Sequence, residues 1–121
     1  LKRGKMRLSQ MQDIAGCRMV VGDVQEQDRV VELLVAALAG VVLHDRREKP
    51  SHGYRAVHIV AFHEGVPVEV QVRTQLQHKW AELCEKMSDI FDPALKYGGG
   101  DEERRATLDL SSKVIERLEN A

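Results

Sequence analysis

A row of polar side chains on one predicted strand is the clearest sign of chemistry in this sequence. From residue 66 to residue 73 valines alternate with polar residues, and alternate residues of a strand point to opposite faces of a sheet. Glu69, Gln71 and Arg73 therefore share one face. Their carboxylate, amide and guanidinium groups can hold a metal ion, the edge of a base and a phosphate. The row predicts a nucleotide site, and the alternative is an ordinary solvated strand face.

A glycine-containing turn before another predicted strand supplies an aromatic ring and two basic groups. Tyr54 directly follows Gly53, and His58 shares its strand face because the two residues are four positions apart. A tyrosine ring can stack on a base, a contact of about 1–3 kcal/mol, and His58 can then reach the ribose or phosphate. Arg55 points to the opposite face of an ideal strand. The alternatives are a tyrosine at the rim with its hydroxyl in water and a histidine held by structural hydrogen bonds.

Three sequence blocks resemble the synthetase domain of the RelA/SpoT family. They are QDIAGCR at residues 12–18, HGYRAVH at residues 52–58, and EVQVRT at residues 69–74 with HKWAE at residues 78–82. Their order and spacing are similar to those of the family from about residue 6 to about residue 97, so the resemblance is far more specific than one short motif. Synthetases of this family move a pyrophosphate from ATP to the ribose 3′-hydroxyl of GDP or GTP, which makes (p)ppGpp.

The resemblance implies a role for each polar residue of these blocks. It makes Asp13 and Glu69 catalytic residues that bind Mg²⁺, an ion usually held by one or two carboxylates together with water and substrate. Glu69 is also expected to help activate the attacking hydroxyl. The expected substrate-binding residues are Arg18, Tyr54, Arg55, His58, Gln71, Arg73 and His78, with Tyr54 stacked on guanine. On the residues alone, the alternatives are that Asp13 caps a turn and that Glu69 pairs with a cross-strand arginine.

The sequence departs from the family pattern in three places. His52 stands where the family commonly has Asn before the glycine of the turn. Of the upstream basic groups with which the family clamps ATP, the sequence offers only Lys2, Arg3, Lys5 and Arg7 as candidates, and the chain begins at Leu1. We therefore expect a domain truncated at its N-terminus. The His-Asp metal block of the long bifunctional relatives is not in the sequence, so we do not expect their nucleotide-degrading activity.

Strand and helix patterns alternate along the chain. Strands are predicted at residues 13–21, 41–44, 54–62 and 66–73, and helices at residues 23–40, from residue 74 onward, and from residue 101 to about residue 119. The second helix has the apolar stripe Leu76, Trp80, Leu83, Met87 and Ile90. These patterns predict an α/β (α+β) fold with a mixed β-sheet and helices packed mainly on one face. The resemblance implies a nucleotidyltransferase-like synthetase domain over residues 1–97, followed at residues 98–121 by a Gly-rich break and an amphipathic helix.

Composition limits the class of protein. A chain of 121 residues with 43% hydrophobic content predicts one domain with a modest core, and a net charge of -1 excludes a strong general binder of polyanions. Two cysteines are too few for a disulfide framework. The longest apolar run, residues 33–43, is too short to span a bilayer. We expect a cytoplasmic bacterial protein without membrane contact.

Three functions are compatible with the sequence. The first is synthesis of (p)ppGpp from ATP and GDP or GTP by a small alarmone synthetase. The second is pyrophosphorylation of tRNA 3′ ends by a toxin-like relative, which needs a basic surface for the RNA. The third is a non-catalytic nucleotide-binding or regulatory domain. The sequence fixes neither the preferred acceptor nor whether the chain forms a homo-oligomer.

Overall fold

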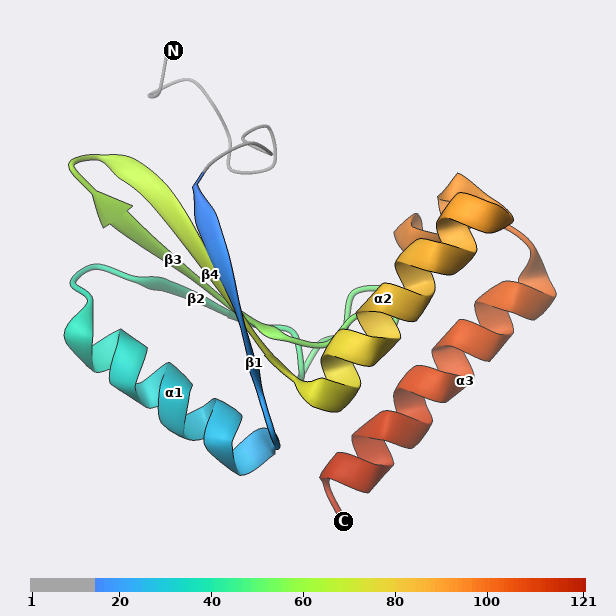
Figure 1. Ribbon diagram of the computed structural model, residues 1–121, viewed down its shortest axis with the longest axis horizontal. Coiled ribbons are helices and arrows are strands. Elements are labelled where there is room, and N and C mark those ends of the chain that lie inside the picture. Colours follow the sequence, from blue (N-terminus) through green and yellow to red (C-terminus); the bar gives the residue numbers. More distant parts are fainter. Residues whose placement is uncertain (1–14) are drawn as a thin grey trace.

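The computed structural model describes residues 15–121 (Figure 1). Its elements are β1 (Gly16–Val21), α1 (Val24–Ala37), β2 (Val42–Asp45), β3 (Val57–His63), β4 (Val66–Thr74), α2 (Gln75–Ile90), the 3-10 helix η3 (Pro93–Tyr97) and α3 (Glu102–Glu119). The order of strands and helices confirms the predicted mixed α/β fold. The prediction places the start of β3 too early, at residue 54, and the sequence patterns do not signal η3. No helix in residues 15–121 has the length and apolar character needed to cross a membrane.

The four strands form one mixed sheet in the order β1-β4-β3-β2. β1 runs parallel to β4 and places Gly16 opposite Glu69, whereas β3 pairs antiparallel with both β4 and β2. Glycine fits at position 16 because a Cβ there would lie 2.9 Å from the backbone oxygen of Glu69. The strand that carries the polar row is therefore an inner strand, with β1 on one side and β3 on the other.

Helix α1 covers one face of the sheet (Figure 1). Val70 and Val72 of β4 pack there with Ile59 of β3 and Val31 of α1 in a buried cluster. Because side chains alternate along a strand, the polar row of β4 points to the other side. We call that side the open face of the sheet.

Helices α1 and α2, which each follow a strand, begin at the predicted capping residues. The Asp23 side chain accepts a hydrogen bond from the backbone N–H of Glu26 at the start of α1. Thr74 and Gln77 form a complete capping box at the start of α2. These caps satisfy backbone N–H groups that the first helical turn leaves without partners.

Helices α2 and α3 lie side by side next to the end of the sheet (Figure 1). Trp80 is buried between them, as predicted, but the rest of the predicted stripe is partly wrong, since Leu83 is 44% exposed and Ile90 is 72% exposed. The buried side of α2 includes Gln77 instead. A polar residue occupies this position because hydrogen bonds from neighbouring elements satisfy its amide, which an apolar pattern cannot reveal.

Candidate active site

A chain of hydrogen bonds joins the polar residues of the open face. In the strand register Gln71 of β4 lies between Arg18 of β1 and His58 of β3. Arg18 Nε donates to Gln71 Oε1 at 3.4 Å, and Gln71 Nε2 donates to Glu69 Oε1 at 2.7 Å. The structure thus brings four of the predicted site residues together on three neighbouring strands.

Tyr54 and Arg73 form the centre of this network. Arg73 donates to the Tyr54 hydroxyl from both Nε and Nη2, and Nη2 also donates to Gln71 Oε1 at 3.2 Å. The same hydroxyl lies 2.7 Å from Nε2 of His58. Cζ of Arg73 is 5.2 Å from the centre of the tyrosine ring, within cation–π range. Tyr54, which comes from the turn before β3, is thereby fixed against β4.

Arg73 also connects the sheet to helix α2. Its Nη1 lies 3.3 Å from Nδ1 of His78, and Nε2 of His78 lies 3.4 Å from Oε1 of Glu82. A guanidinium can only donate, so Nδ1 of His78 accepts and its proton is on Nε2, toward Glu82. Arg73 is 8% exposed, and no carboxylate in residues 15–121 forms an ion pair with it. A buried guanidinium with neutral partners attracts an anion strongly.

His58 is held as a neutral imidazole. Burial lowers the pKa of His58 below its ordinary value, Arg46 and Arg73 lower it further, and Glu69 opposes them. The Tyr54 hydroxyl already accepts from Arg73, so it donates its own proton to Nε2 of His58. These partners assign the histidine proton to Nδ1, which faces Oε2 of Glu69 at 3.8 Å.

A pocket of about 300 Å³ opens beside Tyr54 and Arg73. Charged and aromatic side chains from the sheet, α2 and η3 line it, among them Arg18, Tyr54, Arg73, Glu82, Lys86 and Lys96. The volume is at the lower end of the range for small-molecule sites. Neither Lys86 nor Lys96 is among the residues predicted from the sequence. Lys86 follows Glu82 by one helical turn, a spacing that signals a shared face, whereas Lys96 lies on the unpredicted η3.

The turn that presents Tyr54 depends on Gly53. Its φ is 86°, in the left-handed region, and Ser51 and Tyr54 close the turn with reciprocal backbone hydrogen bonds of 3.1 and 3.0 Å. A Cβ on Gly53 would lie 2.8 Å from Cζ2 of Trp80. Only glycine allows both the backbone conformation and the close approach to the indole.

Arg55 is the predicted substrate-binding residue that lies apart from the others. Its side chain is 5% exposed, its Nη1 donates to Oε1 of Glu119 at 2.8 Å, and its Nε is 3.6 Å from Oε2 of Glu116. Successive side chains of an extended segment point in opposite directions, so Arg55 points away from the side to which Tyr54 points. These ion pairs to α3 support a structural role, and substrate binding by Arg55 stays a prediction.

The predicted metal ligands are described only in part. Asp13 lies outside the described residues. Within residues 15–121 no group of three His, Cys, Asp or Glu side chains could hold a metal ion. The Glu69 side chain is 32% exposed on the open face, and among the described residues its Oε2 has an ion-pair contact only with His58, at 3.8 Å. Glu69 therefore fits the contribution of a single carboxylate to an Mg²⁺ site completed by other ligands.

The fold and the site together define an α/β domain with a cationic pocket on the open face of its sheet. Residues 1–88 match the model of the region found in RelA / SpoT proteins, and the chain belongs to this family. The resemblance deduced from the three sequence blocks is confirmed.

Known proteins resemble this chain over most of its length. GTP pyrophosphokinase YjbM of Bacillus subtilis is 30% identical over an alignment of 121 positions that covers 90% of this chain and 54% of that protein. An uncharacterised protein of Mycobacterium tuberculosis is 32% identical over 87% of this chain, and this chain spans only 40% of its length. The crystal structure of small alarmone synthetase 1 from Bacillus subtilis has a TM-score of 0.71 at 28% identity and covers 98% of this chain and 66% of that one.

Proposed function

We propose that this chain is the core of a synthetase that transfers pyrophosphate from ATP to the 3′-hydroxyl of GDP or GTP and forms (p)ppGpp. Family membership and the relative named GTP pyrophosphokinase support the proposal. The structural observation that carries it is the buried guanidinium of Arg73, which has no carboxylate partner in the described residues and is fixed by Tyr54 beside a pocket. The fork of guanidinium donors matches the geometry of a phosphate. The tyrosine ring beside it can stack on a base, so the two groups together suit a nucleotide.

The acceptor nucleotide would occupy the pocket beside Tyr54. Its guanine would stack on the Tyr54 ring, and its phosphates would bind the guanidinium of Arg73. Arg18, Lys86 and Lys96 line the same pocket and add positive charge. The ring is held by its hydroxyl before any ligand binds, so the stacking surface is preorganised and less conformational entropy is lost on binding.

The transfer needs the remaining residues of the open face. The 3′-oxygen forms a bond to the β-phosphorus of ATP, the bond from that phosphorus to the α–β bridging oxygen breaks, and AMP leaves. Glu69 is the candidate acceptor of the hydroxyl proton, oriented by the Gln71 amide on Oε1 and by His58 near Oε2. Glu69 and Asp13 would also hold Mg²⁺, which when bound neutralises charge on the phosphate oxygens.

A transfer assay tests the proposal directly. The full-length protein is incubated with Mg²⁺ and ATP labelled in its γ-phosphate, separately with GDP, GTP, AMP and tRNA as acceptors, and the labelled product is identified by chromatography. Label on GDP or GTP is the expected result. Label on tRNA alone would instead establish the toxin-like activity. Binding of GDP without transfer to any acceptor would contradict the catalytic proposal and favour a nucleotide-binding domain.

A further inference from the structure

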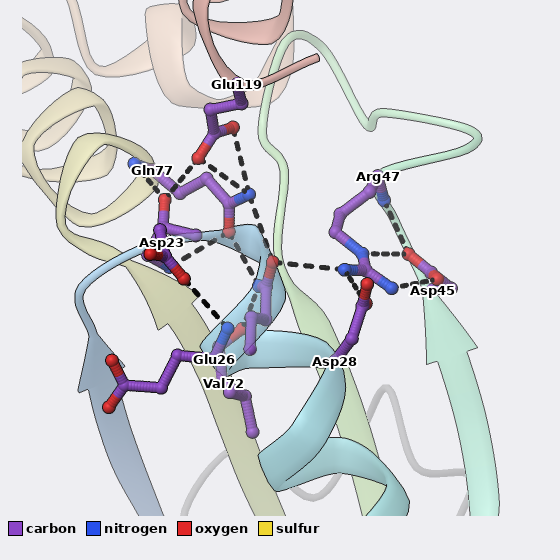
Figure 2. Close-up of polar contacts among 10 residues, drawn as sticks. Asp23, Glu26, Asp28, Asp45, Arg47, Val72, Gln77 and Glu119 are labelled. Carbon is purple, nitrogen blue, oxygen red and sulfur yellow. Dashed lines mark hydrogen bonds and ion pairs between the residues drawn. The ribbon is translucent and has the colours of Figure 1, made fainter. Parts of the chain in front are cut away.

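A second buried polar cluster lies where the end of α3 meets the sheet. It consists of Gln27 from α1, Arg55, Thr74, Gln77 from α2 and Glu119 from the last turn of α3, and we call it the Glu119 cluster. Figure 2 shows Glu119 pointing toward Gln77, with the hydrogen bonds continuing through α1 to Arg47. None of its members belongs to the hydrogen-bond network of the open face.

Glu119 is the centre of this cluster. Its Oε2 accepts a hydrogen bond from Oγ1 of Thr74 at 2.6 Å, and its Oε1 accepts from Nη1 of Arg55 at 2.8 Å and from Nε2 of Gln77 at 3.2 Å. The Glu119 side chain is 5% exposed. Gln27 completes the arrangement, because its Nε2 donates to Oε1 of Gln77 at 2.8 Å. A carboxylate with this many donors is bound far more firmly than an exposed surface ion pair.

The two residues with the shortest hydrogen bonds to Glu119 are the chain neighbours of Tyr54 and Arg73. Arg55 directly follows Tyr54, and Thr74 directly follows Arg73. Arg55 and Thr74 converge on one carboxylate, whereas Tyr54 and Arg73 meet through the tyrosine hydroxyl. We propose that Glu119 is a positioning residue, which fixes the separation and orientation of Tyr54 and Arg73 by holding the residue that follows each of them.

Substitution of Glu119 by Gln is the first test, because Gln keeps the size of the side chain but cannot accept from all three donors. Glu116→Gln is the matched control. Glu116 lies one turn earlier on α3, and its substitution removes the same charge. The contact between Glu116 and Arg55 is longer, at 3.6 Å, and the Glu116 side chain is 43% exposed. The comparison therefore separates the buried anchor from a general effect of charge on α3.

The ring signals of Tyr54 in NMR spectra report its position without any ligand. The chain has only two tyrosines, and Tyr97, 71% exposed, is assigned by Tyr97→Phe. The single Trp80, whose Nε1 donates to the backbone oxygen of Leu108 at 3.0 Å, reports by its fluorescence whether α3 remains docked. Glu119→Gln should shift the Tyr54 signals and leave those of Tyr97 and the Trp80 emission unchanged. Glu116→Gln should shift none of them.

A measurement of GDP binding connects this positioning role to the proposed function. Of the tests of Glu119, only this one rests on the proposed function. The Kd for GDP should rise at least ~10-fold in Glu119→Gln, since small misplacements of site residues are costly, and should change less than ~2-fold in Glu116→Gln. If wild-type protein fails to bind GDP, the proposed function fails, whereas the Tyr54 signals still test positioning.

A second variant covers loss of folding. If the Glu119→Gln protein unfolds or its α3 detaches, Arg55→Lys becomes the test of the positioning role, because lysine keeps the buried charge and loses the guanidinium fork. It should shift the Tyr54 signals in the same way. Unchanged Tyr54 signals in whichever of these two variants remains folded would overturn the assignment of Glu119 as a positioning residue.

Discussion

Arg73 donates two hydrogen bonds to one oxygen atom, the hydroxyl of Tyr54, from Nε at 3.2 Å and from Nη2 at 3.1 Å. The same hydroxyl contacts His58 at 2.7 Å, so its hydrogen-bonding capacity is filled. The tyrosine has two separable parts, a ring that faces the pocket and a hydroxyl that holds a cation. The sequence suggests only the first.

Tyr54→Phe and Tyr54→Ala should separate these two parts. If only the stacking ring mattered, Phe would keep most of the affinity for GDP, but loss of the hydroxyl leaves two donors of a buried guanidinium without their acceptor. We expect Tyr54→Phe to weaken GDP binding by about 1–3 kcal/mol and to leave guanosine binding unchanged, because guanosine has no phosphate. Tyr54→Ala should weaken guanosine binding by about 1–3 kcal/mol through the lost stacking, and should weaken GDP binding by more than this because it removes the hydroxyl as well. Calorimetric titration with GDP and guanosine measures both effects, and equal losses for the two ligands in Tyr54→Phe would contradict this division.

Gly53→Ala should destabilise the fold more than Gly40→Ala. Both glycines have positive φ, 86° and 64°, but a Cβ on Gly53 would meet Trp80 at 2.8 Å, whereas nothing lies within 4 Å of one on Gly40. The left-handed conformation costs each alanine roughly 1–2 kcal/mol, and overpacking against the indole adds about 1–3 kcal/mol. Urea unfolding of the two variants and wild type gives the difference. Equal losses of stability would show that the turn can move away from Trp80.

Local signals in the sequence predict much of the scaffold. Alternation along β4 correctly separates the valines that face α1 from Glu69, Gln71 and Arg73, because burial on one face imposes a period of two. Thr74 and Gln77 mark the start of α2 through a bond between residues three positions apart. Such features depend on neighbours in the chain, so they can be recognised without the tertiary structure.

Contacts between distant residues explain what the sequence does not reveal. Gln77 and Arg55 are buried where Glu119, at least 42 positions away, accepts a hydrogen bond from each of them. The pattern of apolar spacing leaves Gln77 outside the predicted buried stripe, and the substrate-binding role expected for Arg55 comes from the family resemblance. The same limit applies to the pocket, which Lys96 of η3 lines together with Tyr54 because the chain turns back after α2 and packs η3 against that helix.

Asp45 should make the fold sensitive to acid. Its hydrogen bonds with the Arg47 side chain, 2.9 Å from Nε and 2.8 Å from Nη2, lower the pKa of Asp45 below its ordinary value. A depressed carboxyl pKa means that the unfolded chain binds a proton at higher pH than the folded one. The stability gained is thus fully present above the unfolded pKa of about 3.9 and is lost as the pH falls through the folded pKa. Asp45→Asn should therefore lower the melting temperature at pH 6 and have little effect near pH 2.

The control for this prediction is Glu48→Gln, which removes one exposed carboxylate from the turn that follows β2. It should leave the difference in melting temperature between the two pH values nearly as in wild type. If Asp45→Asn also leaves that difference unchanged, the Arg47 contact does not persist in solution.

Glu69→Gln should separate catalysis from binding. Glutamine keeps the size of the side chain and can still accept from the Gln71 amide, a bond of 2.7 Å in the wild-type protein. It lacks the negative charge required to bind Mg²⁺ and to take a proton from the attacking hydroxyl. In the full-length protein we expect transfer to fall by at least about 10²-fold, since charge on the phosphate oxygens is stabilised mainly by metal and cationic groups. GDP binding and the melting temperature should stay near wild type, because Tyr54 and Arg73 are held independently of this charge.

Glu32→Gln provides the comparison for this change, since Glu32 is exposed on α1, on the side of the sheet opposite the site. It should transfer pyrophosphate at the wild-type rate. If Glu69 served only as an ion-pair partner, its charge would contribute about 0–1 kcal/mol and the rate would change little. Steady-state rates at saturating Mg²⁺ distinguish the two cases, and near-normal turnover by Glu69→Gln would refute a catalytic role for this carboxylate. Because raising the Mg²⁺ concentration can compensate for a weakened ligand but not for a lost proton acceptor, a titration of the variant with Mg²⁺ then shows which of the two functions Glu69 performs.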